Sequence, residues 1–122
     1  MLISRVILVL AVFAILGGTK GAVQAQSQPP EFKTMTLAPT KFHEECLELS
    51  VGQTVHYVFD SSRPIDFNIH YHQGHEVTYP VKHQKISKAT DKFVAPIAQV
   101  YCLMWSNPNS TPMTLNYSFQ VR

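Results

Sequence analysis

The stretch IDFNIHYH, residues 65–72, alternates apolar and polar side chains without interruption. Successive residues of a β-strand point to opposite faces of a sheet, so this pattern predicts a strand with one buried face. The side chains expected to face the core are Ile65, Phe67, Ile69 and Tyr71. The side chains expected on the opposite face are Asp66, Asn68, His70 and His72.

Similar patterns occur on both sides of this stretch, with turn-forming residues between them. The expected strands cover residues 34–37, 42–51, 54–60, 65–72, 77–81, 93–97, 100–105 and 113–121. Turns are expected at 52–53, 61–64, 73–74 and 107–110, where Gly, Pro, Asn and Ser gather. About eight short strands with such spacing predict an all-β, antiparallel β-sandwich, jelly-roll-like, in a single domain over residues 33–122.

Three segments have a more specific expected place in this sandwich. Residues 100–105 are apolar on both faces, which is typical of a central strand that is buried on both sides. Pro96 interrupts the segment before it, so an exposed sheet edge is expected there. The lysine-rich run 82–92 is expected to be a solvated connection. Tyr101, Met104 and Trp105 are expected to fill the core, and the alternative is that they line a ligand pocket.

The N-terminal segment has the pattern of an export signal. Arg5 precedes an apolar run of 11 residues, Val6 to Leu16, and permissive residues before Gln26 suit cleavage there. A membrane anchor is the alternative, but a spanning helix needs about 20 apolar residues. We therefore expect a signal peptide over 1–25, a flexible leader over 26–32, and a periplasmic or extracellular protein without a membrane span after cleavage.

The charge balance argues against a nucleic-acid partner. The whole chain has ten basic and eight acidic residues, but Arg5 and Lys20 belong to the expected signal peptide. The remaining chain is neutral when its histidines are uncharged. Proteins that bind nucleic acid usually show a clustered basic surface.

Two cysteines, Cys46 and Cys102, follow the expected signal. In an exported chain such a pair usually forms a disulfide, and two reduced core cysteines are the alternative. A disulfide would connect an early strand to a late one and would remove the only thiol nucleophile. The chain also lacks a Gly-x-Ser-x-Gly motif and a phosphate-binding glycine loop, so an enzyme is not expected.

The order of these motifs resembles the GOLD domain, the lumenal β-sandwich of the emp24/p24 cargo-receptor family. The resemblance covers about residues 42–121 and rests on the motifs ECLEL (45–49), VHYVF (55–59), DFNI (66–69), YCLMWSN (101–107) and LNYSF (115–119). It implies a β-sandwich with a Cys46–Cys102 disulfide and a non-catalytic recognition role. The p24 proteins continue into a coiled coil and a membrane span, whereas this sequence ends at Arg122, and Cys102 follows Tyr101 directly.

The histidines suggest a second function. His70, His72 and His75 form a His-x-His-x-x-His segment, and residues two apart in a strand lie on the same face. Two imidazoles at that spacing, with His75 folded back beyond Gly74, could bind Zn²⁺ or Cu²⁺. The alternatives are an ordinary polar face that is rich in histidine and a pH-sensitive contact.

We therefore expect an exported, non-catalytic binding module that recognises a protein or a small ligand. Its expected binding face consists of Asp66, Asn68, His70 and His72. The alternative is a periplasmic copper- or zinc-binding protein that uses His70, His72 and His75.

Overall fold

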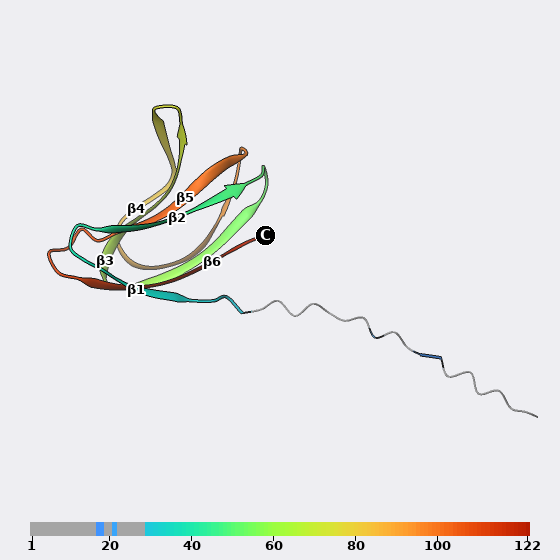
Figure 1. Cartoon of the computed structure of the whole chain (residues 1–122), viewed down its shortest axis with the longest axis horizontal. Coiled ribbons are helices and arrows are strands. Elements are labelled where there is room, and N and C mark those ends of the chain that lie inside the picture. The colour runs from blue at the N-terminus through green and yellow to red at the C-terminus, as the bar shows by residue number, and fades with distance from the viewer. Residues whose placement is uncertain (1–16, 19–20, 22–28) are drawn as a thin grey trace, which may run out of the picture.

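The computed structural model describes residues 17–18, 21 and 29–122, which contain six β-strands (Figure 1). The strands are β1 (Lys33–Leu37), β2 (Phe42–Leu49), β3 (Thr54–Gln73), β4 (Glu76–Val94), β5 (Gln99–Ser106) and β6 (Met113–Val121). This part of the chain contains no helix that could cross a membrane. The expected signal peptide, apart from 17–18 and 21, and residues 26–28 of the expected leader lie outside the described residues.

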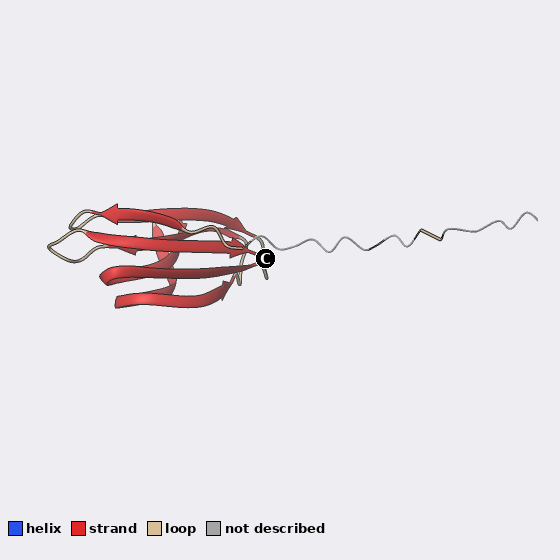
Figure 2. Cartoon of the chain, turned by 90° about the horizontal axis from the view of Figure 1, so that it is seen from below, coloured by secondary structure: helices blue, strands red, loops and turns tan. Residues whose placement is uncertain are grey.

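The strands form one antiparallel sheet in the order β1-β6-β3-β5-β2, and β4 pairs with β3. Residues 55–61 of β3 pair with β6, and residues 66–70 of the same strand pair with β5. Because β5 and β6 follow each other along one edge of β3, a bend in β3 curls the sheet so that its two halves face each other (Figure 1). Seen from below, the strands run side by side along the length of the domain (Figure 2).

We call these parts the β6 half and the β5 half. The β6 half contains β1, β6, the start of β3 and the end of β4. The β5 half contains β2, β5, the end of β3 and the start of β4. The predictions of an all-β antiparallel fold and of a single disulfide are confirmed.

The number of strands differs from the expected eight because β3 and β4 are long. The turn expected at 61–64 lies inside β3, where four residues oppose the single residue Ser87 of β4. The Ser61 hydroxyl contacts the carbonyl oxygens of Arg63 and Ser87, at 2.6 and 3.3 Å. Such an irregularity bends a strand without ending it and can accommodate a proline. The polar residues and Pro64 therefore mark a bend in β3, not a turn between two strands.

The lysine-rich run 82–92 is part of β4, so the prediction of a connection there is wrong, although most of its side chains are exposed as expected. In the described part of the chain β4 pairs with β3 alone, which leaves its other edge free. The expected edge strand at 93–97 is reduced to the end of β4 at Val94. Lysines and a proline on a free edge hinder pairing with another chain, and this edge strand carries Pro80 and four lysines. The lysines are Lys82, Lys85, Lys88 and Lys92.

A second irregularity in the long hairpin depends on Lys85. This residue has a φ of 56°, in the left-handed region that side chains disfavour, and it lies where Ile65 and Phe67 pair with Ile86 and His83. The Asp66 carboxylate accepts a hydrogen bond from the Lys85 backbone N–H at 3.1 Å. Asp66 thus supports the bulge that increases the twist of the hairpin.

We expect Lys85→Gly to raise the free energy of unfolding by about 0.5–1 kcal/mol, because glycine removes the left-handed strain. Chemical denaturation of the purified domain measures this change. Lys88→Gly is the matched control, since Lys88 has no positive φ. It should lower the free energy of unfolding by about 0.5–1 kcal/mol, because glycine weakens the interior of a strand. Equal destabilisation by both substitutions would contradict this role of Lys85.

The core lies between the two halves of the curled sheet. The alternation of apolar and polar residues in β3 and β6 correctly predicted most of the core residues of these strands. The exception is Val121 at the end of β6, which is 41% exposed. In β5 the expectation holds for one face only, because Val100 on the other face is 49% exposed. Tyr101 and Trp105 are core residues. The central buried side chains are Val55, Tyr57, Phe59, Ile65, Phe67, Ile69, Tyr101, Leu103, Trp105, Met113, Leu115 and Tyr117.

Candidate functional site

The Cys46–Cys102 disulfide joins two neighbouring strands on the outer face of the β5 half. The two residues are directly opposite each other in the β2–β5 pairing, with their Cα atoms 3.9 Å apart. Cys102 is buried, whereas Cys46 is exposed. The disulfide therefore fixes the edge strand β2 to β5 and holds the register of this half.

The four residues of the expected binding face share this outer face. The pairing places Asp66, Asn68 and His70 opposite Ser106, Met104 and Cys102, and His72 follows two residues later. Their side chains nevertheless have different surroundings. The Asp66 carboxylate supports the Lys85 bulge, and the Asn68 side-chain oxygen lies 2.7 Å from Nδ1 of His70. Of the four, His72 is the side chain that is exposed to solvent.

His70 is only 5% exposed, although it lies on the outer face. The rings of His72 and Tyr79 lie beside it, with centroid distances of 5.2 and 5.6 Å. Its Nε2 atom lies 3.8 Å from a carboxylate oxygen of Glu44. Burial lowers the pKa of His70, the Glu44 carboxylate partly opposes this, and His72 adds to it. His70 is therefore a neutral, oriented imidazole at neutral pH.

The structure gives a different metal-ligand grouping from the expected three histidines. His70 and His72 are neighbours, as their spacing predicted, and His75 lies in the β3–β4 turn next to Gly74, whose φ is 59°. Among the described residues, three potential ligand atoms lie within 4.8 Å of one another in the group Glu44, His70 and Cys102. This group contains neither His72 nor His75. Metal binding by His70, His72 and His75 stays a prediction.

Exposed apolar side chains lie beside His72, a feature that sequence periodicity missed. Val77 pairs with His72, and Tyr79 packs on His70, so both belong to the outer face. Val100 lies on the same face, two residues from Cys102. Val77, Tyr79 and Val100 are 39%, 47% and 49% exposed. We call His72, Val77, Tyr79 and Val100 the hairpin patch, because His72 and Val77 pair close to the turn that joins β3 to β4. This turn projects from the sheet (Figure 1).

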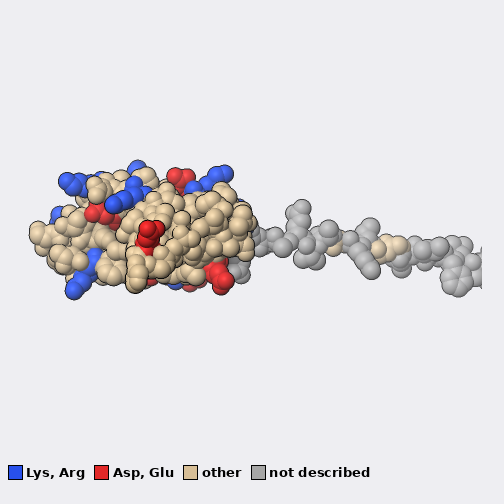
Figure 3. Space-filling model, turned by 90° about the horizontal axis from the view of Figure 1, so that it is seen from above, with Lys and Arg blue, Asp and Glu red and all other residues tan. Residues whose placement is uncertain are grey.

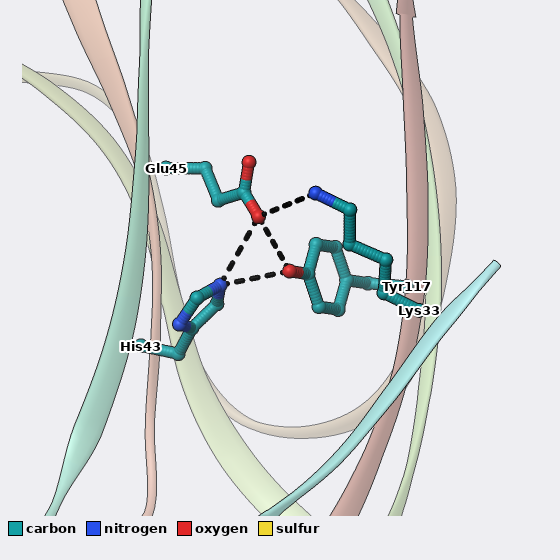
Figure 4. Close-up of polar contacts among 4 residues, drawn as sticks. All are labelled: Lys33, His43, Glu45 and Tyr117. Carbon is teal, nitrogen blue, oxygen red and sulfur yellow. Dashed lines mark hydrogen bonds and ion pairs between the residues drawn. The ribbon is translucent and has the colours of Figure 1, made fainter. Parts of the chain in front are cut away.

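A second polar group lies inside the curl, between the edge strands β1 and β2 (Figure 4). The Tyr117 hydroxyl donates a 2.5 Å hydrogen bond to Glu45, and His43 Nε2 lies 2.8 Å from that hydroxyl. Lys33 of β1 forms a 3.1 Å ion pair with the same Glu45 oxygen. These contacts join two edges that do not pair through their backbones, so we assign this group a structural role.

The stability of this group depends on pH through Glu45. Burial raises the pKa of Glu45, but hydrogen bonds from Tyr117, Lys33 and His43 outweigh it, so the pKa lies below its usual value. A carboxylate with a lowered pKa stabilises the fold above its unfolded-state pKa, and this contribution is lost as the pH falls through the folded-state pKa. We expect the unfolding free energy to fall as the pH drops from the ordinary carboxyl pKa of 4.5 through the lower folded-state pKa, and to fall less in Glu45→Gln. Denaturation curves across that range measure both; an identical pH dependence in the variant would contradict the assignment.

A cavity lies away from both groups, on the β6 half. It has a volume of about 470 Å³, and its lining includes His56, Val58, Thr90, Lys92 and Ser118. None of the residues of the expected binding face, the expected metal site or the disulfide lines it. Acidic and basic side chains are interspersed over the surface seen in Figure 3. The face seen in Figure 3 therefore shows no concentrated patch of a single charge.

Comparison with known proteins does not assign this chain to a family. No family model matches the sequence, and no curated protein matches it. Three similar solved structures have low identity and TM-scores below 0.5. A de novo designed double-stranded β-helix is 17% identical over 74% of this chain and 99% of that chain, with a TM-score of 0.45.

The other two structures are natural proteins. PliG from Aeromonas hydrophila, a periplasmic inhibitor of g-type lysozyme, is 17% identical over 75% of this chain and 86% of that chain, with a TM-score of 0.48. The Yersinia pseudotuberculosis-derived mitogen is 12% identical over 77% of this chain and 88% of that chain, with a TM-score of 0.49. None of the three is described as a GOLD domain, and the resemblance to that domain stays a prediction.

Proposed function

We propose that this protein is an exported, non-catalytic binding module that recognises another exported protein through the hairpin patch. The observation that carries the proposal is that Val77, Tyr79 and Val100 are exposed on the same outer face as His72. Apolar and aromatic side chains that remain exposed together are typical of protein contact sites. The resemblance to the GOLD domain supports a recognition role of the same kind.

The surroundings of the hairpin patch suit a protein partner better than a small ligand. Small ligands usually occupy concave pockets, and the residues of the patch do not line the 470 Å³ cavity. The disulfide lies next to the patch and fixes β5 to β2, so binding would require little ordering of the sheet. Tyr79 is the expected central contact, because a tyrosine combines a large apolar ring with a polar hydroxyl.

Quantitative affinity capture from the exported proteins of the native host tests the proposal. The bait is the mature chain, compared with Tyr79→Ser and with Val94→Ser as the matched control. Val94 is 50% exposed but lies at the end of β4 in the β6 half. Loss of a central tyrosine costs about 2 kcal/mol or more, which corresponds to roughly 30-fold weaker binding.

We expect a partner protein that the wild-type and Val94→Ser baits retain in equal amounts. The Tyr79→Ser bait should not retain it. Retention by all three baits, or loss with Val94→Ser alone, would contradict recognition through the hairpin patch. Circular dichroism of each bait establishes that the variants are folded.

A further inference from the structure

A row of potential metal ligands crosses three neighbouring strands beside the hairpin patch. Cys46 of β2 pairs with Cys102 of β5, and Cys102 pairs with His70 of β3. Glu44 precedes Cys46 by two residues and therefore lies on the same face. The ligand atoms of Glu44, His70 and Cys102 lie within 4.8 Å of one another, and a Glu44 oxygen lies 3.1 Å from the Cys46 sulfur.

We propose that Cys46, Cys102, His70 and Glu44 form a zinc site when the Cys46–Cys102 disulfide is reduced. This site goes beyond the recognition role proposed above and does not depend on it. The ligand set contains two thiolates, one imidazole and one carboxylate. Zn²⁺ accepts all three types in a tetrahedral arrangement, with bonds of about 2.0–2.3 Å.

His70 is oriented as a metal-bound histidine usually is. The Asn68 side-chain oxygen contacts Nδ1 at 2.7 Å, which leaves Nε2 directed towards Glu44. A polar partner on the distal nitrogen fixes the ring and its tautomer in many metal sites. His70 is also nine-tenths buried, although it is polar and lies on the outer face of the sheet. These contacts fix the ring beside Glu44 and within reach of the Cys102 sulfur.

The Cys46–Cys102 disulfide must be reduced before the site can form, and a dithiol can supply the two electrons. A thiolate of the dithiol attacks the exposed Cys46 sulfur and breaks the S–S bond, and the dithiol becomes a disulfide. The protein gains two electrons and two protons as two thiols. Zn²⁺ then displaces both thiol protons as it binds the thiolates. In the reverse exchange the oxidised dithiol accepts two electrons and two protons, the Cys46–Cys102 disulfide re-forms, and Zn²⁺ is released.

Cobalt substitution on the mature chain tests this site. Co²⁺ is added to protein kept reduced by a phosphine and to oxidised protein, and thiolate-to-cobalt absorption is recorded before and after competition with Zn²⁺. The reduced protein should bind one equivalent with two thiolate ligands, and the oxidised protein should show no such band. Asn68→Ala should weaken binding by roughly 10–100-fold through loss of orientation. His70→Ala should weaken it further.

His72→Ala and His75→Ala are the matched controls, since neither residue belongs to the proposed ligand set. Unchanged cobalt binding in both controls supports the site. Equal binding by reduced and oxidised protein, with loss in His72→Ala, would overturn it in favour of the three-histidine hypothesis. If the reduced chain unfolds without metal, Zn²⁺ should restore the near-ultraviolet circular dichroism of buried Trp105. Failure to restore that signal would also overturn the proposal.

Discussion

A Cys46→Ser/Cys102→Ser variant is expected to lose about 4 kcal/mol of unfolding free energy. The disulfide closes a loop with a sequence separation of 56 residues, and the chain-entropy relation for such a loop gives that magnitude. The loss should be large for this domain because β2 pairs with β5 alone among the described strands, so the bridge is what fixes this edge covalently. Urea denaturation of the mature chain measures the loss.

Chemical reduction of the wild-type protein provides the control for this prediction. Without added metal, it should lower the unfolding free energy by about the same amount, because both treatments release the same loop. A loss below about 1 kcal/mol in both experiments would show that β2 needs no covalent link.

Asn107→Ala is expected to cost about 2–4 kcal/mol, because it removes a buried hub of hydrogen bonds. Asn107 is 1% exposed, and its Nδ2 donates to the carbonyl oxygens of Leu37, Ala38 and Thr111 at 3.0–3.3 Å. Its Oδ1 accepts from the backbone N–H and the side chain of Asn109. The substitution removes the donor to the Leu37 carbonyl in a buried place and breaks the four part-buried hydrogen bonds around it. Thermal or chemical denaturation measures the cost.

Asn116→Ala is the matched control for Asn107. Asn116 also forms two side-chain hydrogen bonds, with Thr34 and Asp60, but these lie at the surface, where water can replace them. Its loss should cost less than about 1 kcal/mol. If Asn107→Ala lowers the free energy of unfolding by no more than Asn116→Ala does, Asn107 is not a stabilising hub of hydrogen bonds.

The faces of the strands were predictable from the sequence because they depend on local alternation. Ile65, Phe67 and Ile69 point into the core, as the two-residue period requires. Pro64 and its polar neighbours led to the wrong prediction of a turn at 61–64. The same residue types can form a turn between two strands or a bend within one strand. The difference depends on pairing: β4 runs along the whole of β3, and local sequence does not encode that contact.

The surroundings of the candidate site residues were less predictable, for the same reason. The segment 65–72 places His70 and His72 on one face correctly, but Tyr79 and Glu44 decide that His70 is buried. Both come from other strands. Asn107 was expected in a turn, yet its hydrogen bonds reach Leu37, about 70 residues away in the chain. A burial or contact that depends on distant strands has no signature in a single local pattern.

Site-specific photocrosslinking in the native host tests the central claim, that the hairpin patch contacts a protein partner. A benzophenone amino acid replaces Tyr79 in one version of the full chain and Val94 in the other. We predict a discrete crosslinked protein from position 79 that position 94 does not give, and its loss when Val77→Asp is added beside the probe. No adduct from position 79, or the same adducts from both positions, would contradict the proposed recognition surface.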